Sequence, residues 1–221
     1  MPALIFDLDG TLVDTAPDLL GAMNAVLRAE GRATIDPAAL RHMVGFGARS
    51  LIEQAMAATG APVTPDRLPK LVESFVVHYR AHIADCSRPF PHVADALTKL
   101  AASGARMGVL TNKPQDLVRP LLDKLDLSRF FGAVHGAGRY AYVKPDARVF
   151  HHVRDDLGGP ADGAVMIGDS ATDLATGRAA QVPVILLSYG YTPTPARELG
   201  ADLVLDDFAD VPAAVDRLLR I

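Results

Sequence analysis

Short apolar runs that end in polar residues recur along this chain of 221 residues. Residues Ala3 to Phe6 lead into an Asp-x-Asp-Gly-Thr turn, and later runs end in a similar manner. A short run without polar positions is typical of a parallel strand that is buried on both faces. The later runs are Met107 to Leu110, Ala164 to Ile167 and Val182 to Leu187, with weaker candidates at Ala133 to Gly136 and Leu203 to Leu205.

Segments with helical periodicity separate most of these runs, so that strands and helices alternate along the chain. This alternation predicts an α/β protein with a doubly wound parallel sheet, in which ligands bind beyond the carboxyl ends of the strands. One region departs from the alternation because its amphipathic segments follow one another without a strand. These segments are residues 16–30, 36–43, 48–59 and 65–84.

We therefore expect an all-helical cap inserted after the first strand, between residues 15 and 87. The Rossmann-like core would comprise residues 1–14 and 88–221. The pairs Asp36-Pro37 and Thr64-Pro65 each place a capping residue before a proline, which is typical of the first turn of a helix.

The overall composition is that of a globular protein, with 49% hydrophobic and 22% charged residues. A net charge of −4 favours neither nucleic acid nor an anionic membrane as a partner. The single cysteine, Cys86, excludes an internal disulfide framework and a cysteine-based zinc site. The chain has neither a signal-peptide pattern nor a membrane-spanning stretch. We expect a cytoplasmic protein, either a monomer or a homodimer.

Two pairs of aspartates follow two of the strong apolar runs. Asp7 and Asp9 would leave the end of an extended strand on the same side, and Gly10 permits a sharp turn after them. Carboxylates so placed repel each other, and Mg²⁺ is the simplest compensating ion. Asp169 and Asp173 are spaced so that Asp173 would either reach the ion or orient one of its ligands. The alternative for both pairs is a capped turn that binds no ligand.

Uncharged and basic hydrogen-bond donors follow at two further positions. The hydroxyl of Thr111 and the amide of Asn112 could donate to phosphate oxygens, and Lys144 offers a compact positive charge for a phosphoryl group. Taken singly, Thr111-Asn112 is also compatible with an ordinary turn, and Lys144 with a solvated lysine. The occurrence of all these signals in this order is specific.

Together, these signals resemble the motifs of the haloacid dehalogenase superfamily. The motifs stand here as Asp7-Leu8-Asp9-Gly10-Thr11, Thr111-Asn112, Lys144-Pro145 and Gly168-Asp169-Ser170-Ala171-Thr172-Asp173. The resemblance covers essentially the whole chain, including the place of the helical insertion. Within the superfamily, residues 7–19, 111–114 and 189–191 are similar to the phosphoglycolate phosphatase group.

The resemblance implies a Mg²⁺-dependent phosphomonoesterase that acts on a small phosphorylated metabolite. Asp7 would attack phosphorus to give an aspartyl-phosphate, and Asp9 would serve as general acid and base. Phosphate oxygens would be bound by backbone and side-chain donors of Leu8, Asp9, Thr111, Asn112 and Lys144. The metal would be held by the Asp7 side chain, the Asp9 carbonyl and Asp169, with Asp173 as a ligand or in support.

A Gly-Phe-Gly-Ala-Arg segment in the expected cap contains two candidate selectivity residues, Phe46 and Arg49. Arg49, near a helix start, could receive a substrate carboxylate. The phosphoglycolate phosphatase group often has a polar residue in place of Phe46, and the motif at Lys144-Pro145 continues with Asp146-Ala147 where His-Pro is frequent. Both departures concern the choice of substrate.

The resemblance favours 2-phosphoglycolate as the substrate. Another sugar phosphate, pyrophosphate, and a phosphomutase reaction similar to that of β-phosphoglucomutase are alternatives, and a noncatalytic phosphoacceptor module of the receiver type is a remote one. An acid at Asp9 disfavours dehalogenation, because a halide leaves without a proton.

Overall fold

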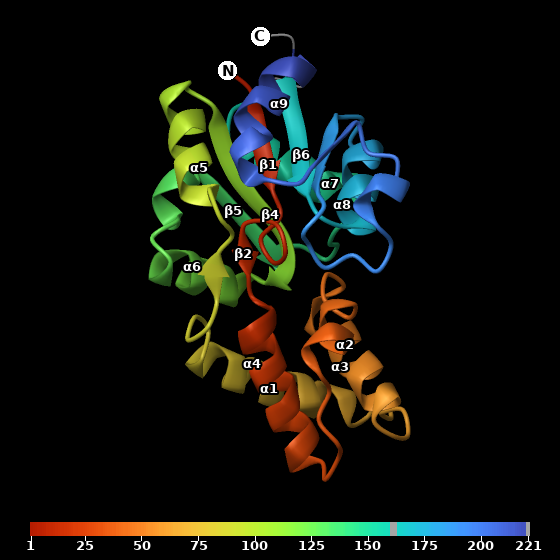
Figure 1. Cartoon of the computed structure of the whole chain (residues 1–221). Coiled ribbons are helices and arrows are strands. Elements are labelled where there is room, and N and C mark those ends of the chain that lie inside the picture. The colour runs from red at the N-terminus through yellow and green to blue at the C-terminus, as the bar shows by residue number, and fades with distance from the viewer. Residues whose placement is uncertain (160–162, 220–221) are drawn as a thin grey trace.

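The computed structural model describes residues 1–159 and 163–219. Its main sheet has six strands in the order β5-β4-β1-β6-β7-β8, and neighbouring strands pair in parallel throughout (Figure 1). The strands are β1 (Ala3–Phe6), β4 (Arg106–Pro114), β5 (Ala133–Ala137), β6 (Ala164–Gly168), β7 (Val184–Leu187) and β8 (Leu203–Leu205). The predicted doubly wound sheet is confirmed, including its two weaker strands.

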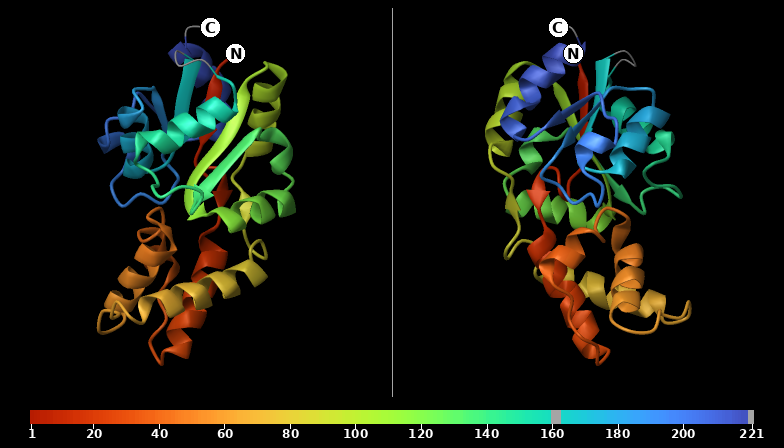
Figure 2. Two further views of the ribbon diagram at one scale, coloured as in Figure 1. Left: turned by 180° about the vertical axis from the view of Figure 1, so that it is seen from behind. Right: turned by 45° about the vertical axis from the view of Figure 1, so that its right-hand side comes forward.

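Helices cover both faces of this sheet, because alternate residues of the buried strands point to opposite sides. In β1, Leu4 and Phe6 pack in one apolar cluster with α5, α6 and α9, whereas Ala3 and Ile5 pack in another with α7. Figure 2 shows these layers from two further sides. The helices of the core are α5 (Val93–Ala102), α6 (Gln115–Lys124), α7 (Ala147–Asp156), α8 (Ala171–Ala179) and α9 (Val211–Leu219), and short 3₁₀ turns are Ser128–Phe130, Ala196–Glu198 and Phe208–Asp210.

Consecutive helices after β1 form a separate layer beyond the carboxyl ends of the strands (Figure 1). These helices are α1 (Ala16–Ala29), α2 (Pro37–Arg41), α3 (Gly47–Ala58) and α4 (Leu68–Ala81). The predicted start of α2 is confirmed, since Asp36 accepts a hydrogen bond from the Ala39 N–H at 2.8 Å. The predicted start of the last helix is wrong. It begins at Leu68, with Pro69 in its first turn, because the residues after Thr64 form a separate turn.

Two short strands join the helical layer to the core. The strands β2 (Val13–Asp14) and β3 (Arg88–Pro89) pair in an antiparallel ribbon. Just beyond it, the buried carboxylate of Asp18 accepts hydrogen bonds from the Ser87 N–H at 2.7 Å and the Ser87 hydroxyl at 2.6 Å. The two chain crossings are therefore tied to each other where they leave the core.

None of the helices in the described residues combines the length and the apolar composition that a membrane crossing requires.

Candidate active site

Three buried aspartates converge at the carboxyl edge of the sheet. Asp7 follows β1, Asp169 follows β6, and Asp173 lies in the first turn of α8. Carboxylate oxygens of the three lie within 4.8 Å of one another. The loop after β1 passes so close that a Cβ on Gly10 would lie 2.6 Å from an Asp169 oxygen, and Gly10 has a φ of +89°. Only glycine meets both conditions without strain.

Hydrogen bonds fix the two carboxylates that follow β6. Asp169 accepts from the Thr11 hydroxyl at 2.7 Å and from the Tyr191 N–H at 2.8 Å. Asp173 Oδ2 accepts from the N–H groups of Asp169 and Ser170, and Asp173 forms a capping box with Ser170 at the start of α8. The capping role and the place in the acidic cluster, which the sequence offered as alternatives for Asp173, therefore coexist.

The acidic cluster is only partly neutralised by the protein. Lys144 Nζ lies 2.6 Å from Asp173 Oδ1 and 2.9 Å from Asp7 Oδ1. Burial raises the pKa of Asp7 to about 6, against the lowering effect of Lys144, and burial with the neighbouring carboxylates raises the pKa of Asp169 well above its usual value. Burial alone would lower the pKa of Lys144, but Asp173 and Asp7 outweigh it and raise that pKa.

This donor set fits a metal ion. Each carboxylate of the cluster is buried, and hard oxygen ligands in this number suit a divalent cation completed by waters and phosphate. Within the described residues, Asp7 Oδ1 accepts no well-directed hydrogen bond, so that it has coordination capacity to spare.

The structure brings the predicted uncharged donors to the same edge. Thr111 and Asn112 lie in β4, which continues to Pro114 and does not end at Leu110 as predicted. Asn112 exchanges two hydrogen bonds with the backbone of Lys144, at 3.0 and 3.2 Å, and so ties two of the motifs together. The N–H groups of Leu8 and Asp9 have no acceptor among the described residues.

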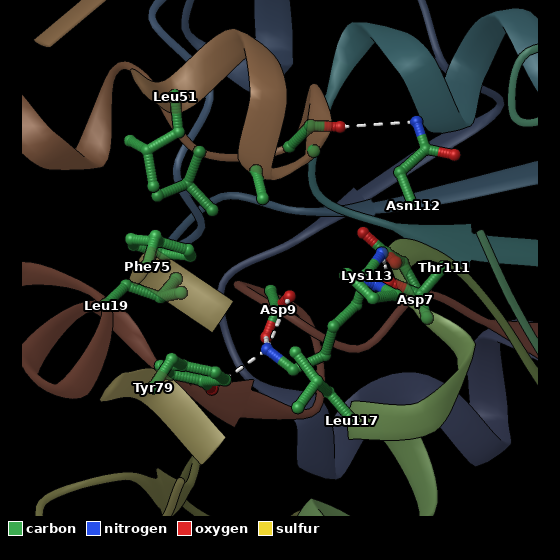
Figure 3. A pocket seen from close by; sticks show the side chains of 15 residues that line it. Asp7, Asp9, Leu19, Leu51, Phe75, Tyr79, Thr111, Asn112, Lys113 and Leu117 are labelled. Carbon is green, nitrogen blue, oxygen red and sulfur yellow. Dashed lines mark hydrogen bonds and ion pairs between the residues drawn. The ribbon is translucent and has the colours of Figure 1, made fainter. Parts of the chain in front are cut away.

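A second ion pair lies on the side of the site that faces the helical layer. Lys113 Nζ donates to both carboxylate oxygens of Asp9, at 3.0 and 3.2 Å, and to the Tyr79 hydroxyl at 2.9 Å (Figure 3). Neither Lys113 nor Tyr79 was singled out by the sequence analysis. The available signal was the position of Lys113 two residues after Thr111, because alternate residues of a strand point to one side.

A pocket of about 490 Å³, partly open to solvent, lies between the helical layer and the sheet edge. Asp7, Asp9 and Lys113 line it from below, and α1, α3 and α4 line it from above. The helical layer touches the motifs directly, since Asn112 Nδ2 lies 3.5 Å from the Gly45 carbonyl oxygen (Figure 3).

The two candidate selectivity residues do not line this pocket, although their neighbours Gly45, Gly47 and Ala48 do. Phe46 is 53% exposed. The Arg49 side chain is 69% exposed and pairs with Glu53 at 3.4 Å.

Comparison with known proteins agrees with this geometry. A profile described as haloacid dehalogenase-like hydrolase matches residues 4–187. The chain belongs to the haloacid dehalogenase-like hydrolase family. Its resemblance to that family in sequence and its α/β core with a helical cap are thereby confirmed.

Curated members of this haloacid dehalogenase-like family are similar over nearly the whole chain. A protein of Caulobacter vibrioides named phosphoglycolate phosphatase is 48% identical, with 98% of this chain and 91% of that protein covered. A protein of the same name from Agrobacterium fabrum is 41% identical, with 99% and 94% covered. A solved structure from Haemophilus somnus, described as a predicted phosphoglycolate phosphatase, superposes with a TM-score of 0.91 at 28% identity and covers 97% of both chains.

Proposed function

We propose that the protein is a Mg²⁺-dependent phosphatase of 2-phosphoglycolate that works through an aspartyl-phosphate. The convergence of Asp7, Asp9 and neutral phosphate donors in one pocket carries this proposal. The names of its relatives, at up to 48% identity over nearly the full chain, support the choice of substrate.

Asp7 and Asp9 divide the chemistry between them. A carboxylate oxygen of Asp7 attacks phosphorus, the ester P–O bond breaks, and the protonated carboxyl of Asp9 gives its proton to the leaving alkoxide. Asp9, now ionised, then takes a proton from water, which attacks the same phosphorus. Inorganic phosphate leaves, and the Asp7 carboxylate is restored.

The donors around Asp7 bind the oxygens of the transferring phosphoryl group. The free N–H groups of Leu8 and Asp9, the Thr111 hydroxyl and the Lys144 ammonium are suited to this task, and Asn112 holds the Lys144 backbone in place. Fixed donors cost no reorganisation during the reaction, so that they favour the transition state.

Asp7, Asp169 and the Asp9 carbonyl would hold Mg²⁺, and Asp173, whose oxygens engage Lys144 and the backbone, would act in support. When bound, Mg²⁺ shields the phosphate from the negative charge of the nucleophile. Its buried carboxylates explain why the protein needs a cation there.

Residues 15–87 are proposed to act as a cap that covers the pocket and selects the substrate, with the remainder of the chain as the phosphatase core. The ribbon of β2 and β3 is suited to be the hinge, because the chain crosses between the two parts there. A location in the cytoplasm stays a prediction.

The test is phosphate release with Mg²⁺ from a panel of 2-phosphoglycolate, sugar phosphates, pyrophosphate, nucleotides and phosphoserine. We expect 2-phosphoglycolate to give a kcat/KM above about 10⁴ M⁻¹s⁻¹ and Asp7→Asn to give no turnover. A higher kcat/KM with another panel member would refute the substrate. Near wild-type turnover by Asp7→Asn would refute the covalent scheme.

A further inference from the structure

The pocket contains a single basic side chain among its lining residues in the described part of the chain, and that residue is Lys113. Lys144 lies deeper, paired with Asp7 and Asp173. Arg49 lies outside the pocket and pairs with Glu53. Any second negative charge on a substrate, beyond its phosphate, therefore has only Lys113 as a cationic partner within the pocket.

Lys113 retains hydrogen-bonding capacity. It is 5% exposed, and its ammonium group, which has three N–H donors, serves Asp9 and the Tyr79 hydroxyl. The Tyr79 hydroxyl accepts from Lys113, and its own proton has no acceptor within the described ranges. Burial raises the pKa of Tyr79 to about 12, so this hydroxyl keeps its proton at neutral pH.

The surrounding wall gives an anion no other site. Leu19, Leu51 and Phe75 line the pocket from the cap, and a carboxylate placed against them would lose its hydration without compensation. Tyr79 belongs to the same wall, and in Figure 3 it stands beside Phe75 and Leu19 with its hydroxyl toward Lys113. The polar corner of the cap wall is thus confined to Tyr79 and Lys113.

We propose that Lys113 Nζ and Tyr79 Oη form a recognition site for a carboxylate on the leaving group of the phosphoester. This inference rests on the proposed phosphatase function and defines its substrate class. Lys113 is hydrogen-bonded to Asp9, the residue proposed to protonate the leaving oxygen. A carboxylate one carbon away from that oxygen therefore reaches Lys113, and 2-phosphoglycolate has this arrangement.

The test compares 2-phosphoglycolate with its carboxamide, which keeps the shape but not the charge. The measured quantity is the ratio of kcat/KM for the acid to kcat/KM for the amide. We expect Tyr79→Phe and Lys113→Met each to lower this ratio by about 10- to 100-fold, mainly through KM of the acid. Lys70→Met and Tyr140→Phe are matched controls on exposed or remote positions and should leave the ratio unchanged.

A purely structural role predicts a different result. If Lys113 and Tyr79 serve only to position Asp9, both esters lose activity by the same factor, and the recognition site is overturned. A fall of the ratio in Arg49→Ala alone would also overturn it, because the carboxylate would then lie at the cap loop. Tyr79→Phe keeps the test valid if the buried Lys113→Met variant does not fold.

Binding separates failure of this inference from failure of the proposed function. Calorimetry in Mg²⁺ on an Asp7→Asn background measures the affinities of the acid and the amide without turnover. At least tenfold tighter binding of the acid, lost on adding Tyr79→Phe, supports the site even if the wild type hydrolyses neither ester. Equal affinities overturn it, even if the wild type proves to be an active phosphatase.

Discussion

Replacing Asp7 by asparagine should stabilise the metal-free protein. Burial raises the pKa of Asp7 from 3.8 to about 6, so the folded state holds the proton more tightly than the unfolded state. The stabilisation from this proton is complete below the unfolded pKa and is lost as the pH rises through the folded pKa. The difference between 3.8 and about 6 corresponds to roughly 3 kcal/mol at pH 7.5. Asparagine does not ionise and avoids this cost.

The assay is unfolding by urea in EDTA between pH 5 and pH 8. Asp7→Asn should raise the free energy of unfolding by about 3 kcal/mol at pH 7.5 and by roughly half as much at pH 5. Glu73→Gln, the same chemical change at an exposed position, should have little effect. A destabilising Asp7→Asn, or a gain that does not vary with pH, would refute the assignment of this cost to the buried carboxylate.

Three other changes test the site and its supports. Gly190→Ala would place a Cβ 2.2 Å from the Asp169 side chain, so we expect the Mg²⁺ concentration for half-maximal activity to rise at least about tenfold; an unchanged value would contradict this. Asp9→Asn should lower kcat for 2-phosphoglycolate by about 10²- to 10⁴-fold in a phosphate-release assay, and a loss below tenfold would exclude the acid-base role. Asp18→Ala leaves the buried Ser87 donors without their acceptor and should lower the free energy of unfolding in urea by about 2 to 4 kcal/mol, whereas a loss under about 1 kcal/mol would argue against the tie between the chain crossings.

The sheet and its functional edge could be predicted because buried parallel strands have a strong local signature. The run Ala3 to Phe6 is apolar throughout, since both faces of β1 pack against helices. Its polar continuation then marks the carboxyl edge of the sheet. The ribbon of β2 and β3 has no such signature, because a strand of two residues is too short for any periodicity.

Contacts between the cap and the core were beyond local patterns. Arg49 follows a glycine-rich turn, as a ligand-binding residue could, but the rotation of α3 directs its side chain to Glu53 and away from the pocket. Tyr79 follows Phe75 at a helical spacing that indicates only a buried face. Its meeting with Lys113 depends on how the cap lies over the sheet, which the spacing of residues within one helix does not specify.

The two buried lysines divide the charges of the site into two halves. Lys144 balances Asp7 and Asp173 where the phosphoryl group would react, and it belongs to the core alone. Lys113 balances Asp9 on the leaving-group side, and there the cap adds the Tyr79 hydroxyl. Because the cap touches only the second half, changes in the cap can alter which leaving group is accepted while the attack on phosphorus keeps its geometry. In this arrangement, selectivity and chemistry meet at Asp9, the one carboxylate that contacts the leaving oxygen in the proposed reaction.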